Sequence, residues 1–278
     1  MTHSNTLHQE ISGDYALAIN QSQANAPRIK HAEKLGYDAE TLTAIPAEAA
    51  GSSFGCGNPL ALSGIKEGDT VVDLGSGAGL DVILAAKKVG PDGHVIGVDM
   101  TAEMIETAQA NIAKAGLTNA EIRKGFIEKL PLEDNSVDWI ISNCVLNLSP
   151  DKPAVFAEIF RVLKPGGQVV VSDIVAEDLP AEIRASAALH SACLSGAISW
   201  SAYQDGLQQA GLTQVAVLDR LDYSAEQMHA MVFTGSAPGT RRFVANLPEE
   251  TREETLNAIL RSLEGKVASI KFQAQKTG

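Results

Sequence analysis

The sequence has little positive charge and no long apolar segment. Its 278 residues include 22 Lys and Arg against 34 Asp and Glu, a formal net charge of -12 at pH 7. This excess of acid opposes binding to nucleic-acid phosphates and to anionic lipid surfaces. No apolar run approaches the ~20 residues that a helix needs to span a bilayer, and the polar start MTHSNTLHQE lacks the basic and apolar regions of a signal peptide. We therefore expect a cytoplasmic protein that binds neither nucleic acid nor a membrane.

Cysteine is also scarce. Cys56, Cys144 and Cys193 are odd in number and far apart, so they are not typical of a disulfide framework. In a reducing compartment we expect all three to remain thiols that are available as ligands. Cys56 lies between two glycines in the open stretch AAGSSFGCGNPLALSGI. For each single cysteine, an inert buried side chain and a functional ligand remain equally open.

The stretch at 71–79, VVDLGSGAG, is an apolar run with an acid followed by three alternating glycines. It predicts a strand, a tight loop and a helix, and Gly75, Gly77 and Gly79 let a ligand approach the backbone closely. A dinucleotide loop has its third glycine one residue later, and Asp73 would repel a pyrophosphate. The same acid would attract a ligand that carries an ammonium and a sulfonium group, as S-adenosylmethionine does. An ordinary strand-to-helix turn has the same local pattern.

From residue 70 onwards, strand patterns alternate with amphipathic helix patterns, which is typical of a doubly wound α/β fold with a mostly parallel sheet. Strands are expected at residues 70–74, 94–98, 120–124, 137–142, 167–174, 213–220 and 267–275. Helices are expected at residues 80–89, 102–115, 152–163, 180–192 and 200–210. Asp99 ends the second strand, where an acid can accept hydrogen bonds from two ribose hydroxyls. A helix cap is the alternative for Asp99.

The acid-x-Gly-x-Gly-x-Gly loop resembles the first motif of the class I methyltransferases, and LKPGG at 163–167 resembles the turn before their fifth strand. This resemblance implies a Rossmann-like seven-stranded sheet with an antiparallel last strand. It also implies that Asp99 binds the ribose of S-adenosylmethionine, with Met100 beside the adenine. Ile127 and Glu128, in KGFIEKLPLEDNSVDWI, would contact the edge of the base. The residues of the first motif that would bind the cofactor are Asp73, Gly75, Ser76, Gly77 and Gly79.

Three segments, each with one cysteine, resemble the arsenite methyltransferase family in particular. They are GCGNP at 55–59, SNCVLNLSPDK at 142–152 and CLSGA at 193–197. The resemblance implies that Cys56, Cys144 and Cys193 bind the trivalent arsenic of the substrate and that Asn143 contacts the cofactor. Soft centres prefer thiolates, and three sulfurs in a pyramid leave the lone pair of arsenic free to attack a methyl carbon. The family also implies a thiol reductant, glutathione or thioredoxin, that delivers the substrate and restores the cysteines.

The sequence departs from many members of that family because no cysteine precedes Cys56. The number of methyl additions therefore does not follow from the resemblance. The expected function is S-adenosylmethionine-dependent methylation of trivalent arsenic, and two alternatives remain. One is a carbon- or oxygen-methyltransferase of a small metabolite with incidental cysteines. The other is a thiol-based binder of arsenic or metal without turnover, and the presence of Asp73, Asp99 and Glu128 argues against it.

We expect three regions along the chain. Residues 1–64 would form an N-terminal helical segment with the Cys56 loop, residues 65–175 the S-adenosylmethionine-binding domain, and residues 176–278 the substrate side, a helical insertion and the final strands. In the first region, residues 1–10 are expected to be disordered. A helix would follow from Ile11, with a second piece running past Pro27 to Leu35.

The third region contains an insertion at about 222–265 that has a helical pattern and no recognisable motif. In the strand that follows it, Ala268, Ile270, Phe272 and Ala274 alternate with polar residues, so they are expected to face the core.

Overall fold

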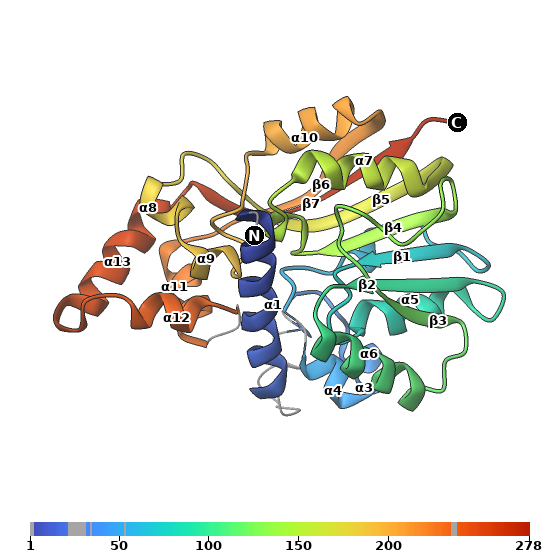
Figure 1. Ribbon diagram of the computed structural model, residues 1–278, viewed down its shortest axis with the longest axis horizontal. Coiled ribbons are helices and arrows are strands. Elements are labelled where there is room, and N and C mark those ends of the chain that lie inside the picture. The colour runs from blue at the N-terminus through green and yellow to red at the C-terminus, as the bar shows by residue number, and fades with distance from the viewer. Residues whose placement is uncertain (1–2, 22–31, 34, 53, 235–237) are drawn as a thin grey trace.

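The computed structural model describes residues 3–21, 32–33, 35–52, 54–234 and 238–278 (Figure 1). At its centre is a seven-stranded sheet with the order β3-β2-β1-β4-β5-β7-β6. The strands are β1 (Thr70–Leu74), β2 (His94–Asp99), β3 (Ala120–Lys124), β4 (Val137–Asn143), β5 (Leu163–Ala176), β6 (Leu212–Asp222) and β7 (Val267–Lys276). β7 pairs antiparallel with β5 and β6, and the other pairs are parallel. The prediction of a mostly parallel, doubly wound sheet with an antiparallel last strand is confirmed.

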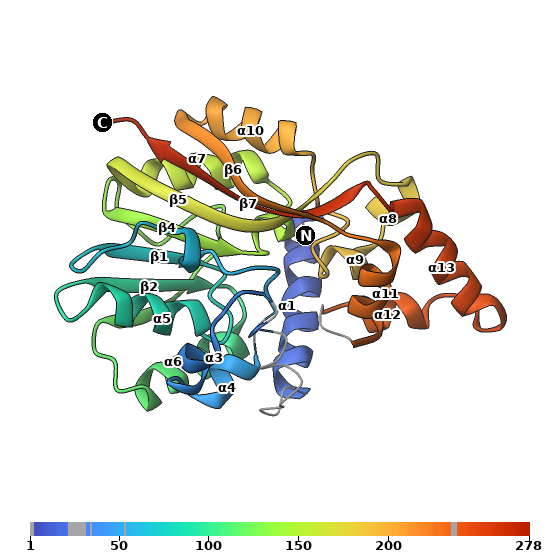
Figure 2. The same cartoon turned by 180° about the vertical axis from the view of Figure 1, so that it is seen from behind.

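Helices cover both faces of this sheet. Figures 1 and 2 show α7 and α10 on one side and α5 and α6 on the other. These four helices are α5 (Leu80–Val89), α6 (Ala102–Lys114), α7 (Lys152–Val162) and α10 (Trp200–Gln209). The remaining helices and 3-10 turns are α1 (His3–Gln21), α3 (Ala39–Thr43), α4 (Ala47–Gly51), η1 (Leu60–Leu62), η2 (Leu146–Leu148), α8 (Ala181–Arg184), α9 (Ala187–His190), α11 (Ala225–Thr234), α12 (Thr240–Ala245), η3 (Glu249–Thr251) and α13 (Arg252–Leu263). None of the helices that the structure describes is apolar over a length that could cross a bilayer.

Consecutive residues of the central strand β1 belong to different apolar cores. Val71 is packed in the cluster that contains Ile83 of α5, whereas Val72 is packed in the cluster that contains Ile159 of α7. Successive side chains of a strand point to opposite faces, and here both faces are covered. Burial on both faces explains why β1 is a continuous apolar run in the sequence, without alternation.

The helix and strand boundaries agree closely with the sequence, and the exceptions have local causes. The single helix expected at 180–192 is two short helices, because the Ser186 hydroxyl accepts a hydrogen bond from the backbone N–H of Leu189 and starts α9 anew. β5 begins at Leu163, ahead of the expected start, and includes the LKPGG segment as an irregularity in its pairing with β4.

The expectation of disorder over residues 1–10 is wrong for residues 3–10, because α1 begins at His3, and the first two residues lie outside the described ones. The polar residues at its start give a weak sequence signal, and tertiary contacts stabilise the helix. Leu7 and Ile11 pack into an apolar cluster, and the His8 ring stacks on Phe126 with centroids 4.8 Å apart. The second helical piece expected past Pro27 falls largely outside the described residues.

The insertion before β7 is mainly helical within the described residues, as expected. The helices of the insertion are α11, α12 and α13. Figures 1 and 2 show them next to α8 and α9, on the side of α1 that faces away from α5 and α6. From α13, Leu256, Leu260 and Leu263 are buried in one cluster at helical spacing. The same cluster contains all three cysteines, so the insertion packs against the segments that carry them.

Phe272 is at the centre of the antiparallel end of the sheet. It is fully buried, and its ring lies 5.3 Å from that of Tyr203 and 5.4 Å from that of Trp200. We predict that Phe272→Ala lowers the free energy of unfolding by about 3 to 5 kcal/mol, since it removes apolar contacts and leaves a cavity. Urea denaturation measures the change. The control Gln273→Ala, at a half-buried neighbour, should change it by less than about 1 kcal/mol; equal effects would contradict this packing.

Candidate functional site

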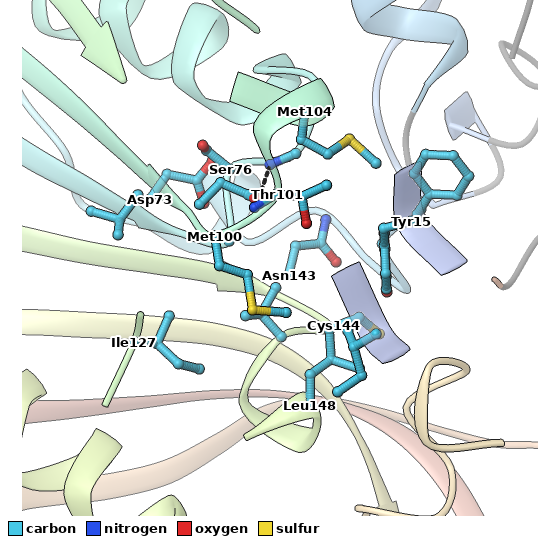
Figure 3. A pocket seen from close by; sticks show the side chains of 18 of the residues that line it. Tyr15, Asp73, Ser76, Met100, Thr101, Met104, Ile127, Asn143, Cys144 and Leu148 are labelled. Atoms are coloured by element: carbon cyan, nitrogen blue, oxygen red, sulfur yellow. Dashed lines mark hydrogen bonds between the residues drawn. The ribbon is translucent and has the colours of Figure 1, made fainter. Parts of the chain in front are cut away.

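A pocket lies where the loops after β1, β2, β3 and β4 meet, and α1 borders it. Figure 3 shows Tyr15 of α1 on the same side as Cys144, whereas Asp73 and Ile127 lie on the other side. In a doubly wound sheet this edge, at the carboxyl ends of the strands, is the usual ligand crevice. Every residue expected to bind S-adenosylmethionine lines this pocket except Gly79, which is the N-cap residue of α5 immediately behind it.

The glycine-rich loop is held tightly against neighbouring elements. The N–H groups of Gly75 and Ser76 both donate to the carbonyl oxygen of Val98, at 2.8 and 3.1 Å. Gly75 has a φ of 67°, and a Cβ at this position would overlap the side chain of Val145. The Ser76 hydroxyl is buried and has no hydrogen-bond partner among the described residues.

The charges of the pocket favour a cationic ligand. Asp73, Asp81 and Asp99 line it, and neither lysine nor arginine is among its described lining residues. The pKa of Asp73 is raised well above its usual range by burial and then by repulsion from the other two acids. Burial also raises the pKa of Asp81 to about 6. An ammonium or sulfonium group would offset this concentration of buried acid, whereas a pyrophosphate would add to it.

Asp99 connects two of the loops through its carboxylate. One oxygen accepts the N–H of Gly77 at 2.9 Å, and the other accepts the N–H of Thr101 at 2.8 Å. Thr101 is the N-cap residue of α6 and makes no side-chain cap bond of its own. Asp99 is therefore not the N-cap of α6, although it accepts the N–H of the N-cap residue, and it lines the pocket beside Met100.

Glu128 is held by residues that the sequence did not single out. The Nε2 atom of His8 lies 3.1 Å from its carboxylate, and the Ser149 hydroxyl donates to the same oxygen. His8, Ile11 and Tyr15 line the pocket from one face of α1 at helical spacing. Only the three-to-four-residue spacing could have indicated this face, and the sequence gives no sign of its partners.

The three cysteines come together beside the pocket, although their chemical state differs from the expectation. Cys56 and Cys144 form a disulfide with Cα atoms 5.8 Å apart, whereas Cys193 is a buried free thiol. The expectation that all three are thiols is therefore wrong for this structure. The physical reason is that the Cys56 loop packs on the end of β4 and places the two residues within disulfide reach. Their separation of 88 residues concealed this proximity.

Cys193 lies next to the disulfide. Its thiol donates to the carbonyl oxygen of Cys144 at 2.8 Å and also forms a hydrogen bond with the hydroxyl of Tyr15. Burial, followed by the nearby charge of Asp173, raises the pKa of the Cys193 thiol well above its usual range. The thiol is therefore held in its neutral form near pH 7.

A buried acid, Asp173, is also part of this cluster. One of its oxygens and the sulfurs of Cys56 and Cys144 all lie within 4.8 Å of one another. The carboxylate accepts hydrogen bonds from the side-chain amide of Asn147 at 2.9 Å and the hydroxyl of Tyr203 at 3.1 Å. Burial raises the pKa of Asp173 to about 6. Asp173 is an acid within the mostly apolar run of β5, and this pattern was the one sequence signal that marked it.

Trp200 and His190 lie close in sequence to Cys193 but are not among the described residues that line the pocket. Trp200 packs against the core ring of Phe272 and does not line the pocket. His190 ends the short helix α9, and its Nε2 atom lies 3.2 Å from the carbonyl oxygen of Leu148.

Comparison with known proteins agrees with the fold and the motifs. The family described as "Methyltransferase domain" matches residues 65–211. An arsenite methyltransferase of Halobacterium salinarum is 43% identical over 218 residues, which cover 78% of this chain and 54% of the relative. A human arsenite methyltransferase is 39% identical over 171 residues, which cover 58% of this chain and 45% of the relative. The chain spans about half the length of these curated relatives.

A solved structure extends the similarity. The crystal structure of an arsenic(III) S-adenosylmethionine methyltransferase from Chlamydomonas reinhardtii superposes with a TM-score of 0.65 and 32% identity, over 86% of this chain and 72% of that one. Together with the sheet order and the glycine-rich loop, these similarities place the chain in the class I, S-adenosylmethionine-dependent methyltransferases. Within this class, the chain belongs to the arsenite methyltransferase family.

The buried acids predict a pH-dependent stability of the ligand-free protein. The pKa of Asp81 is raised to about 6 in the folded state, above the value of about 4 expected in the unfolded chain. The folded state therefore binds more protons in this range, and stability is lost as the pH rises through it.

Asp81→Asn removes that loss. From pH 4 to pH 7, the free energy of unfolding of the variant should rise relative to wild type by up to about 3 kcal/mol. Urea denaturation at several pH values measures the difference. The surface variant Asp92→Asn is the control and should stay parallel to wild type. Parallel curves for Asp81→Asn would mean that this carboxyl is not buried as described.

Proposed function

We propose that the protein methylates trivalent arsenic, with S-adenosylmethionine as the methyl donor and Cys56, Cys144 and Cys193 as the arsenic ligands. The observation that carries the proposal is the meeting of these three cysteines, from three distant segments, directly beside a pocket lined with acids. Membership of the arsenite methyltransferase family supports it. We assign residues 1–64 to an N-terminal helical segment with the Cys56 loop, residues 65–175 to cofactor binding, and residues 176–278 to the substrate side, the helical insertion and the final strands.

The acids of the pocket fit S-adenosylmethionine, which supplies an electrophilic methyl group on a sulfonium. Asp73 and Asp81 offer buried negative charge to a cation. The ribose would bind at Asp99, next to Ser76 in the pocket lining. Met100, Ile127 and Glu128 would enclose the base, and α1 borders the pocket through His8, Ile11 and Tyr15. Asn143 completes the lining next to Cys144.

Arsenic binding requires the disulfide between Cys56 and Cys144 to be opened. Two equivalents of a small thiol, such as glutathione, or one dithiol of thioredoxin, would reduce it and leave as a disulfide. Arsenite, As(OH)3, would then exchange three hydroxyls for three cysteine sulfurs and release three waters. The thiol protons leave with those waters, so the raised pKa of Cys193 does not prevent loading.

The backbone at two of the cysteines supports a functional role. Cys144 and Cys193 both have a φ of 60°, a conformation that residues with a side chain seldom adopt. Such strain persists where the surrounding structure fixes it, and it concentrates at functional sites. Here it turns both residues toward the same cluster. With the nucleophile and the methyl carbon held at ~3 to 3.5 Å, positioning would be the main contribution of the protein to catalysis.

The cofactor assignment predicts that Asp99→Ala weakens S-adenosylmethionine binding by about 2 to 3 kcal/mol. The variant removes a charged acceptor from the ribose site and releases the N–H groups of Gly77 and Thr101. Titration calorimetry measures the dissociation constant, and a melting curve confirms that the variant folds. A folded variant with the wild-type constant would remove Asp99 from the ribose site.

The arsenic site predicts a pattern among serine variants. Cys144→Ser and Cys193→Ser should each abolish arsenite methylation with S-adenosylmethionine affinity nearly unchanged, because a hydroxyl remains protonated and hard. Cys56→Ser should also abolish methylation of arsenite. Its effect should be smaller on a monomethylated arsenical, which needs only two sulfurs.

Labelled S-adenosylmethionine, with and without arsenite and a thiol, provides the assay, and melting curves accompany the rates. If all three folded variants methylate arsenite at the wild-type rate, the cysteines are incidental. Methylation of a small metabolite without arsenic would then be the better assignment. Binding of arsenite by the wild type without any methyl transfer would instead indicate a binder.

A further inference from the structure

The side-chain amide of Asn143 is used mainly on the loop that carries Cys56. Its Oδ1 atom accepts the backbone N–H of Cys56 at 2.9 Å and that of Gly57 at 3.2 Å. Its Nδ2 atom donates to the carbonyl oxygen of Gly57 at 2.7 Å. The Asn143 side chain thus bonds to the backbone N–H and carbonyl oxygen of Gly57 and to the backbone N–H of Cys56. Asn143 is also the residue before Cys144 at the end of β4.

The loop is shaped to receive this amide. A Cβ at Gly55 would overlap the Asn143 side chain, and a Cβ at Gly57 would overlap the hydroxyl of Ser172. Cys56 therefore stands between two glycines that let the loop approach the ends of β4 and β5. From β7, the Ser269 hydroxyl donates to the carbonyl oxygen of Cys56 at 3.2 Å. These contacts fix the loop by its backbone and leave its sulfur directed at Cys144.

The side-chain amide of Asn143 is itself hydrogen-bonded to residues outside the loop. Its Nδ2 atom lies 3.1 Å from the hydroxyl of Tyr37, which donates to a carboxylate oxygen of Asp81 at 2.7 Å. Tyr37 is only 3% exposed. Because Asp81 and Asn143 both line the pocket, the chain of hydrogen bonds runs from the proposed cofactor site to the Cys56 loop. Buried networks of this kind hold side chains in one orientation.

We propose that Asn143 is the positioning residue of Cys56: its amide, supported by Tyr37 and Asp81, holds the 55–57 loop so that the sulfur of Cys56 lies against that of Cys144. This inference rests on the proposed function for its consequence in catalysis. Asn143 determines whether the third sulfur is in place, and hence whether arsenite, which needs three sulfurs, is accepted as readily as a monomethylated arsenical, which needs two.

The proximity of the two sulfurs can be measured without arsenic. Reduced protein is equilibrated with defined ratios of reduced and oxidised glutathione, so that one glutathione disulfide is reduced to two thiols for each Cys56–Cys144 bond that forms. Alkylation of the remaining thiols and mass spectrometry of the peptides give the equilibrium constant. Asn143→Ala should lower this constant at least about tenfold, since it removes three hydrogen bonds that hold the loop. Tyr37→Phe should lower it less, because only the support of the amide is lost.

Asn119→Ala is the matched control. Its amide also ties a loop, by donating to the carbonyl oxygens of Ala86 at 3.0 Å and Gly90 at 2.7 Å, and it is not among the pocket residues. The control should leave the constant within about twofold of wild type. A folded Asn143→Ala variant with the wild-type constant overturns the proposal. If that variant does not melt cooperatively, an unchanged constant in Tyr37→Phe overturns it.

The kinetic consequence is tested separately. At saturating S-adenosylmethionine, the ratio of the KM for arsenite to the KM for a monomethylated arsenical should rise about tenfold in Asn143→Ala, because only arsenite needs the sulfur that Asn143 positions. Equal changes in the two KM values would mean that the amide does not act through Cys56. Should the wild type not methylate arsenite at all, the proposed function fails, and the glutathione equilibrium still decides whether Asn143 positions Cys56.

Discussion

The concentration of buried acid at the carboxyl ends of the strands is the constraint on which the site depends. Asp73 is the penultimate residue of β1, Asp99 is the last residue of the neighbouring β2, and Asp81 lies in the first turn of α5. Their charges raise one another's free energy, and the described lining of the pocket supplies no lysine or arginine to offset them. A cation that binds there relieves the repulsion and stabilises the folded state at the same time. The preference of the pocket for a cation and the stabilisation by such a ligand therefore have one electrostatic cause, and α1 borders the pocket in which it acts.

The sheet and its flanking helices could be predicted because their signals are local. Val71 and Val72 are buried on opposite faces, so an apolar run without alternation identified β1. Alternation identified β7, where Ala268, Ile270, Phe272 and Ala274 are all buried. Pocket residues such as Asp73 and Asp99 could be selected because strand ends converge at one edge of a parallel sheet. The positions of these residues were accessible from the sequence, whereas their roles in binding remain proposals.

What the sequence did not reveal depends on contacts between distant segments. α1 is stabilised by the interaction of His8 with Glu128, which is 120 residues away. The three cysteines were selected by resemblance, and no spacing indicated that Cys56 and Cys144 are close enough to form a disulfide. Tyr203 reaches Asp173 from α10 without any motif around it. Hydrogen bonds between residues so far apart in the sequence leave no periodic pattern in it. They can therefore be identified only in the folded structure.

The position of β7 between β5 and β6 has a consequence for the order in which the chain is synthesised. β6 ends at Asp222 and its only strand partner in the described sheet, β7, begins at Val267. A ribosome therefore completes β6 and the whole helical insertion before the strand that joins β6 to the sheet exists. During that interval Val217, Leu218 and Leu221, which are exposed even in the folded protein, lie on a strand with both edges unpaired. Unpaired apolar strands associate with other chains, so the nascent protein is most exposed to aggregation just before its sheet closes.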